Sequence, residues 1–185
     1  MINNHRVILI TGASSGIGKC CAEYLSQQGH RVYGTSRRIE STTSERLSSN
    51  TNLFQMIQMD VTDESSVKNG IASILARESR IHVVLIEPGD FKTEITTQRQ
   101  KAEKSTENPA YRGSFQKVLR IVESGERKAP TPEPIARLID KIIRKNSPRL
   151  RYTVGTNSQR IAVLLKKILP SRLFESLITN AFQAN

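Results

Sequence analysis

The sequence has no tryptophan and only two cysteines, Cys20 and Cys21, which are adjacent. Adjacent cysteines make neither a spaced disulfide framework nor a metal knuckle, so both are expected to be reduced, small apolar residues. Uninterrupted apolar runs such as 7–10 and 83–86 fall far short of the roughly 20 residues that a membrane-spanning helix needs. These shortages exclude a disulfide-rich domain and argue against a transmembrane segment.

The composition is otherwise that of an ordinary globular protein, with 185 residues, of which 37% are hydrophobic and 24% are charged. This length fits one domain with a tail better than it fits two small domains. The start of the chain lacks the succession of basic, apolar and small residues that marks a secretory signal. We therefore expect a cytoplasmic protein.

The net charge of +11 is concentrated in the second half, where residues 82–185 carry 19 Lys and Arg against 10 Asp and Glu. Between Lys141 and Arg172 there are nine basic residues and no acidic one. Such a field favours phosphates, nucleic acid or an anionic membrane surface, and a solvated helix face is the alternative. Because no zinc-finger, RNA-binding or basic-zipper pattern accompanies it, no nucleic-acid partner is expected.

Apolar and β-branched runs alternate with amphipathic stretches along the chain. Strands are predicted at 6–10, 31–35, 53–59, 82–87 and 150–154, and helices at 20–28, from 62, at 111–124, at 134–145 and from 158. Pro170 is expected to break the last helix. The alternation predicts an α/β, Rossmann-like three-layer fold with a parallel sheet. We expect one dinucleotide-binding domain at 1–155, with a lid or loop region at about 93–134, and a basic amphipathic helical tail at 156–185.

A glycine-rich turn joins the first predicted strand to the first predicted helix. The start of a helix offers unpaired backbone N–H groups and a partial positive charge, which suit a diphosphate. Gly12 permits the sharp turn, Gly16 allows close approach of the diphosphate, and Gly18 lets the helix pack against the strand. The turn residues expected to contact a dinucleotide are Gly12, Ser14, Ser15, Gly16, Ile17 and Gly18.

The ends of the second and third strands indicate which dinucleotide is bound. An acid after the second strand would hold the adenosine ribose, whereas this chain has Arg37 and Arg38, which suit a 2′-phosphate. We therefore predict NADP rather than NAD, with Arg37 as the main phosphate ligand and Arg38 as a weaker, or merely solvated, neighbour. Asp60 is placed to accept from the adenine amino group, with Val61 against the ring; a helix N-cap is the alternative for Asp60.

Together these features resemble the short-chain dehydrogenase/reductase family. The resemblance is carried by Thr11-Gly-Ala-Ser-Ser-Gly-Ile-Gly18, Arg37, Asp60-Val61 and Pro88-Gly-Asp-Phe-Lys-Thr93. It implies hydride transfer between NADP(H) and an alcohol or carbonyl carbon, and the segments 132–139 and 150–155 resemble members that act on hydrophobic substrates. It also implies that Pro88, Gly89 and Thr93 lie against the cofactor, although Thr93 could instead cap the turn that follows.

The family's catalytic parts are missing from this chain. None of its four tyrosines has a lysine four residues later, and there is no Asn-Asn-Ala-Gly turn. Since related proteins run to roughly 250 residues, about 80 residues are inferred to be absent near Arg80–His82. In family terms this segment holds the Tyr and Lys of catalysis and the helices of dimerisation. No catalytic residue, metal site or substitute histidine is therefore expected.

If whole strand–helix pairs are missing, strands and helices still alternate along the chain, so we expect a parallel sheet with fewer strands. Its predicted order is 53–59, 31–35, 6–10, 82–87 and 150–154. The favoured interpretation is an NADP-binding relative of these oxidoreductases that is inactive as it stands. The alternatives are a non-enzymatic NADP-binding protein that binds a partner or an anionic membrane through its tail, and an enzyme completed by a partner chain.

Overall fold

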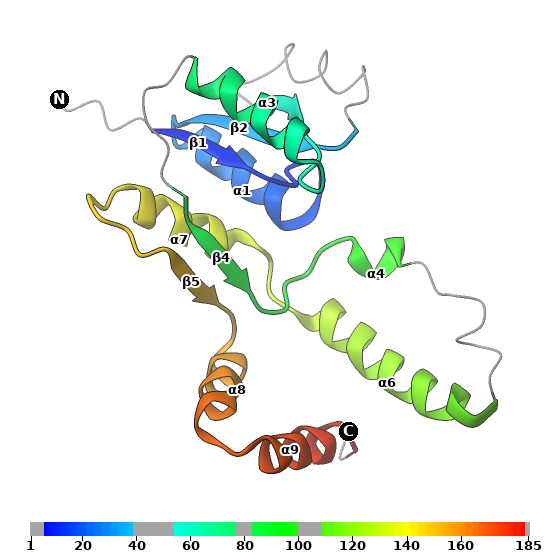
Figure 1. Cartoon of the computed structure of the whole chain (residues 1–185). Coiled ribbons are helices and arrows are strands. Elements are labelled where there is room, and N and C mark those ends of the chain that lie inside the picture. Colours follow the sequence, from blue (N-terminus) through cyan, green and yellow to red (C-terminus); the bar gives the residue numbers. More distant parts are fainter. Residues whose placement is uncertain (1–5, 39–53, 77–82, 100–108, 184–185) are drawn as a thin grey trace. The chain divides into compact units, whose positions relative to one another are not determined.

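The computed structural model describes residues 6–38, 54–76, 83–99 and 109–183, and Figure 1 draws their helices and strands. The chain divides into two compact units. The first unit comprises Met1–Leu85 and Pro132–Tyr152, and the second comprises Ile86–Thr131 and Thr153–Asn185. Each unit is described by itself, and the predicted domain boundary at residue 155 stays a prediction.

The first unit contains a three-stranded parallel sheet in the order β1-β2-β3. Its strands are β1 (Val7–Ile10), β2 (Arg31–Ser36) and β3 (Gln55–Gln58), and its helices are α1 (Gly16–Gln27), α3 (Glu64–Leu75) and α7 (Glu133–Ile143). Val7 is in register with Arg31, and Tyr33 with Gln55. The predicted order of the first three strands is therefore confirmed.

The core of this unit forms where the apolar face of α1 meets the sheet. Ala22 and Leu25 of α1 are fully buried against Ile8, Val32 and Phe54. Helix α7 packs beside α1, because apolar residues at intervals of three and four face inward from both helices. A segment that begins more than a hundred residues after α1 thus completes its core.

The second unit contains four helices in the part of the chain that the structure describes. They are α4 (Ile95–Gln98), α6 (Pro109–Lys128), α8 (Asn157–Ile168) and α9 (Ser171–Gln183). Helix α6 contains the predicted helix 111–124 and is longer at both ends. Helix α8 ends just before Pro170 and α9 begins just after it, which confirms the predicted break.

The strands β4 (Leu85–Pro88) and β5 (Arg151–Val154) form a separate two-stranded sheet. The Leu85 N–H donates to the Leu150 carbonyl at 2.7 Å, and the Gly89 N–H donates to the Val154 carbonyl at 2.6 Å. Because both bonds advance four residues along each strand, the two strands run parallel. The predicted pairing of 82–87 with 150–154 is confirmed.

The predicted pairing of 82–87 with 6–10 is wrong for the strands as described, because β4 is hydrogen-bonded to β5 in a sheet of its own. An apolar run predicts that a strand forms, but it does not encode which edge that strand joins. Val83 and Leu85 are 75% and 45% exposed, so this segment is not buried on both faces as an inner parallel strand would be. The α/β fold with short parallel sheets is nevertheless as expected.

Candidate functional site

The glycine turn has the geometry of an anion-binding helix start. Gly12 and Gly16 have φ values of 69° and 54°, in the left-handed region that favours glycine. Helix α1 begins at Gly16, and the side chain of its N-cap, Ser15, makes no capping hydrogen bond. The first turn of α1 also contains no acidic residue. The positive end of this helix is therefore left for a ligand to neutralise.

Gly18 holds the turn against the start of α1. A Cβ on Gly18 would lie 2.3 Å from the Gly12 carbonyl oxygen and 2.8 Å from the Gly12 carbonyl carbon. Both of these atoms belong to the backbone, so no side chain can rotate out of the way. The structure thus bears out the steric reason for a glycine at this position.

Strand β2 supports the turn through contacts with Ala13, which lies in the turn, and one of these contacts depends on Gly34 of β2. Neither Ala13 nor Gly34 was predicted as a site residue from the sequence. The Ala13 N–H donates to the Thr35 carbonyl at 2.9 Å. A Cβ on Gly34 would lie 2.7 Å from both the Ala13 Cβ and the Phe54 ring. A glycine inside a β-branched strand marks a close backbone approach, so this signal was present in the sequence.

Arg37 and Asp60 line the same shallow depression at the carboxyl end of the three-stranded sheet. Its volume is about 360 Å³, and its lining consists of Arg37, Ile57, Gln58, Asp60, Ser66, Asn69, Gly70 and Ser73. The Gln58 side-chain amide donates to the Arg37 carbonyl at 3.2 Å, which joins the ends of β2 and β3. The two residues predicted for the adenosine end of a dinucleotide are therefore brought together.

Asp60 is ionised and held by its own loop. Its carboxylate accepts from the Thr62 N–H at 2.9 Å and from the Thr62 hydroxyl at 2.7 Å. These bonds, with a smaller contribution from the charge of Arg37, hold the pKa of Asp60 below its usual value. The helix cap is Asp63, which accepts from the Ser65 N–H at 3.0 Å. The alternative interpretation of Asp60 as the N-cap of α3 is thus wrong.

Arg38 and Val61, the residues that follow Arg37 and Asp60, are exposed to solvent. Arg38 is exposed, and its N–H donates to the Ser36 hydroxyl at 3.3 Å. Val61 is 59% exposed, so an apolar surface borders Asp60 where an adenine ring is predicted. Both positions are compatible with contact to a bound nucleotide.

The remaining predicted cofactor ligands lie in the second unit. Pro88 ends β4, and Gly89 donates its N–H to β5. The Thr93 hydroxyl accepts from the Ile95 N–H at 3.4 Å at the start of α4, although the N-cap of that helix is Glu94. Contact of Pro88, Gly89 and Thr93 with a nicotinamide stays a prediction.

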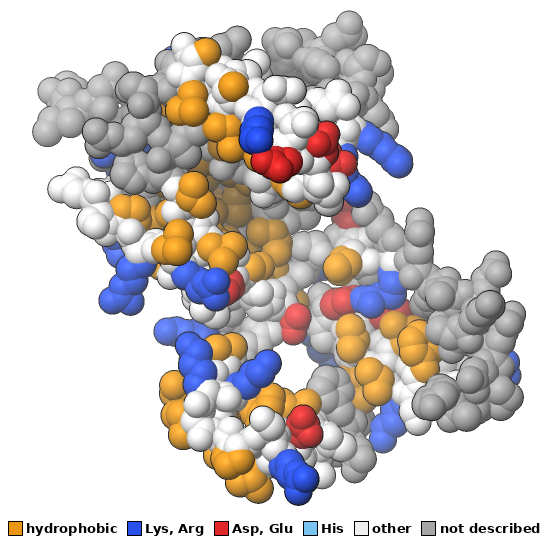
Figure 2. Space-filling view, in the orientation of Figure 1, with side chains coloured by type: hydrophobic (Ala, Val, Ile, Leu, Met, Phe, Trp, Pro, Cys, Tyr) orange, Lys and Arg blue, Asp and Glu red, His pale blue; other side chains and the backbone are white. Residues whose placement is uncertain are grey.

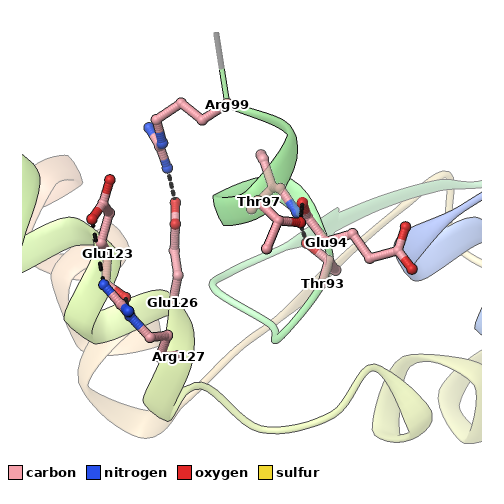
Figure 3. A network of polar contacts seen from close by, with 8 residues as sticks. Thr93, Glu94, Thr97, Arg99, Glu123, Glu126 and Arg127 are labelled. Carbon is pink, nitrogen blue, oxygen red and sulfur yellow. Dashed lines mark hydrogen bonds and ion pairs between the residues drawn. The ribbon is translucent and has the colours of Figure 1, made fainter. Parts of the chain in front are cut away.

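One ion pair joins the end of α4 to α6 beyond Thr93, and a second lies within α6 (Figure 3). The Arg99 guanidinium donates to the Glu126 carboxylate, and Arg127 pairs with Glu123 at 3.4 Å. Arg99 and Glu126 are largely buried, at 27% and 15% side-chain exposure, so their pairing is screened less by water than a surface pair. This network fixes the segment that follows β4.

A tyrosine and a lysine do meet in the first unit, although their spacing in the sequence did not suggest it. The Lys145 ammonium lies 5.6 Å from the centre of the Tyr152 ring. It is over the ring, whereas the Tyr152 hydroxyl accepts from the Arg149 N–H at 2.9 Å. This arrangement is a cation–π contact.

His30 has a structural role. Its Nδ1 accepts from the Arg6 N–H at 3.1 Å, and its Nε2 lies 3.0 Å from the Asp140 carboxylate. The side chain is only 2% exposed, so it cannot reach a substrate. His5 and His82 lie outside the described residues. Within the described ranges, no three His, Cys, Asp or Glu side chains gather to hold a metal ion.

Comparisons with known proteins identify the family. The sequence model of the short chain dehydrogenase family matches residues 6–84. The chain is 27% identical to 3-ketodihydrosphingosine reductase of Bacteroides thetaiotaomicron over 256 aligned positions, which cover 92% of this chain and 95% of that protein. Because 92% of this chain is about 170 residues, about 86 of those positions have no residue of this chain opposite them.

A second relative matches a shorter part of the chain. The chain is 31% identical to NADP-dependent 3-hydroxy acid dehydrogenase YdfG of Escherichia coli K12 over 83 residues, which are 45% of this chain and 33% of that protein. A solved short-chain dehydrogenase from Streptomyces avermitilis superposes with a TM-score of 0.58 at 18% identity, covering 90% of this chain and 97% of that one. The family model, these relatives and the shared fold together support placing this chain among the short-chain dehydrogenases/reductases.

Proposed function

We propose that this chain binds NADP(H) at the carboxyl end of its three-stranded sheet and that it does not transfer hydride by itself. The observation that carries the proposal is the convergence of three features in one unit. The uncapped start of α1 fits a diphosphate, and the same unit has a depression lined by Arg37 and Asp60 at the carboxyl end of its sheet. NADPH, when bound, would supply the hydride of the family reaction.

The preference for NADP over NAD rests on Arg37. A 2′-phosphate would introduce a doubly charged anion beside a guanidinium that binds phosphate oxygens in a fixed planar geometry. No acidic residue stands at 36–38, where one would repel that phosphate. The name of the E. coli relative, which matches 45% of this chain, describes an NADP-dependent enzyme.

The proposed lack of activity rests on the missing Tyr-x-x-x-Lys and Asn-Asn-Ala-Gly motifs. The family match ends at residue 84, close to the join inferred at 80–82, and the long alignment leaves about 86 positions unfilled. A bound carbonyl would then have no group to donate a proton as hydride arrives. The substrate class of the parent enzymes is a hydrophobic alcohol or carbonyl compound.

Thermal unfolding of the purified chain with NADPH, with NADH or with neither tests the binding. Saturation at about 100 times Kd adds roughly 2.7 kcal/mol and raises Tm by several degrees. We expect a shift with NADPH that exceeds the shift with NADH. No shift with either cofactor would refute the proposed site.

Two arginine variants separate the roles of the neighbouring side chains. Arg37→Ala should reduce the NADPH shift to the level of NADH, whereas Arg38→Ala, which makes the same change of charge one residue later, should retain most of it. NADPH oxidation with a panel of hydrophobic ketones and aldehydes should not exceed the rate without protein. Turnover by the chain alone would refute the proposed inactivity without affecting the binding result.

A further inference from the structure

Helices α8 and α9 present apolar side chains to solvent. None of the described residues of α8 is buried. Phe174 is partly covered, but the exposed large apolar residues of the two helices have exposed fractions of 36–68%, and the main ones are Ile161, Leu164, Leu165, Ile168, Leu173 and Leu177. We call this set the apolar face of α8–α9. Figure 2 shows hydrophobic side chains gathered over these helices, with Lys and Arg beside them.

The spacing of these residues is that of an amphipathic helix. On α8 the apolar positions 161, 164, 165 and 168 recur at intervals of three and four, so they share one side of the helix. Lys166 and Lys167 project from the other side. The helix is also well formed locally, because Thr156 and Gln159 make a capping box at its start. The apolar side is therefore held in place without being covered.

The charged side chains on these two helices are mainly positive. Helices α8 and α9 contain four basic residues, Arg160, Lys166, Lys167 and Arg172, against a single acid, Glu175. The larger segment from Lys141 to Arg172 has nine basic residues and no acidic one. A second copy of the chain would bring the same positive charge to the interface, so self-association through this face is opposed by repulsion. An anionic surface that also accepts apolar groups is complementary to it.

We propose that the apolar face of α8–α9 docks on an anionic lipid surface. The helices would lie in the plane of the interface, with apolar residues inserted at the boundary of headgroups and acyl chains and with Lys and Arg beside the lipid phosphates. No helix in the described parts of the chain is long and apolar enough to cross a membrane. The proposal does not depend on cofactor binding, which is assigned to the first unit.

Vesicle sedimentation with the full chain tests the docking. The probes are vesicles of phosphatidylcholine alone and of phosphatidylcholine with a quarter phosphatidylglycerol. We expect binding to the anionic vesicles at low salt, release at high salt, and little binding to the neutral vesicles. Because each basic side chain near an anionic surface contributes about fivefold, Lys166→Ala with Lys167→Ala should weaken binding about thirtyfold.

A matched pair of variants separates apolar insertion from charge. Leu164→Glu and Thr179→Glu each add one negative charge at an exposed helical position, but only Leu164 belongs to the apolar face. Thr179→Glu should weaken binding about fivefold through its charge. Leu164→Glu should weaken it by a further tenfold or more, because an apolar side chain is lost as well. Far-UV circular dichroism checks that both variants keep their helices.

Three results would overturn the proposal. One is the absence of vesicle binding at low salt, and another is equal binding to neutral and anionic vesicles. The third is a concentration-dependent dimer that Leu164→Glu abolishes while vesicle binding is absent, since the face would then be covered by a second copy. NADPH-dependent thermal shifts are measured in parallel, so failure of docking and failure of cofactor binding are distinguished.

Discussion

Replacement of Gly18 by alanine tests whether the glycine turn is packed as the structure shows. The added Cβ would lie 2.3 Å from the Gly12 carbonyl oxygen, which is 0.7 Å inside the 3.0 Å limit that real Cβ contacts observe. Overpacking of this kind costs about 1–3 kcal/mol. Alanine returns up to about 1 kcal/mol through its higher helix propensity. We expect a net loss of about 1–2 kcal/mol in the free energy of unfolding.

This loss is measured by thermal unfolding followed by circular dichroism, where it should lower Tm by roughly 2–8 °C. The turn must open to admit the methyl group, so its N–H groups would move away from a bound diphosphate and the NADPH-dependent shift should also fall. Gly113→Ala is the control, because a Cβ on Gly113 meets nothing within 4 Å in the helix α6. It should be neutral or stabilise by up to about 1 kcal/mol.

Comparison of Gly18→Ala with Gly113→Ala tests whether the close contact at the glycine turn exists in solution. If Gly18→Ala is as stable as the parent chain and retains the full NADPH shift, the close contact between α1 and the Gly12 carbonyl does not exist in solution. If both variants destabilise equally, the effect is not specific to the turn. Either result would refute the steric argument.

Two further predictions concern ionisable groups in the first unit. The bond from Arg144, with a smaller contribution from His30, holds the pKa of Asp140 below its usual value, so its carboxylate stabilises the fold above about pH 4 and this stabilisation is lost as the pH falls through the lowered pKa. Asp140→Asn should therefore reduce stability at neutral pH and flatten its decline in acid, as urea titrations at several pH values would show; an unchanged acid profile would contradict this. Burial raises the pKa of the Cys21 thiol to about 12, so iodoacetamide should label the partly exposed Cys20 first and label Cys21 only after unfolding. Peptide mass spectrometry measures the order, and early labelling of Cys21 would show that α1 is not packed as described.

Much of the first unit could be predicted from the sequence because its signals are local. The turn 12–18 directly follows a β-branched strand, and its glycines act on atoms only a few residues away. The helix from residue 62 was also expected, and α3 follows at Glu64 with Asp63 rather than Asp60 as its N-cap. Local spacing therefore predicted the elements, but not every residue at their ends.

The features that the sequence did not predict depend on residues far apart in the chain. The packing of α7 on α1 and the His30–Asp140 pair join segments separated by 110 residues. The contact between Lys145 and Tyr152 depends on how the chain turns between α7 and β5. The predicted pairing of β4 with β1 was wrong for the same reason, because the apolar pattern of a strand does not specify the edge that it joins.

Under the proposed function, the position of the inferred deletion would separate cofactor binding from catalysis. The glycine turn, Arg37 and Asp60 lie on β1, β2, β3 and their connections, which are continuous in sequence up to the join inferred at 80–82. Their supporting contacts, such as that between Ala13 and Thr35, are made within the same stretch. Catalysis in the family needs a tyrosine and a lysine that come after the join. Under the proposed function, a deletion there would remove the proton-transfer groups and leave the glycine turn, Arg37 and Asp60 in the chain, so NADPH binding without turnover is the expected combination.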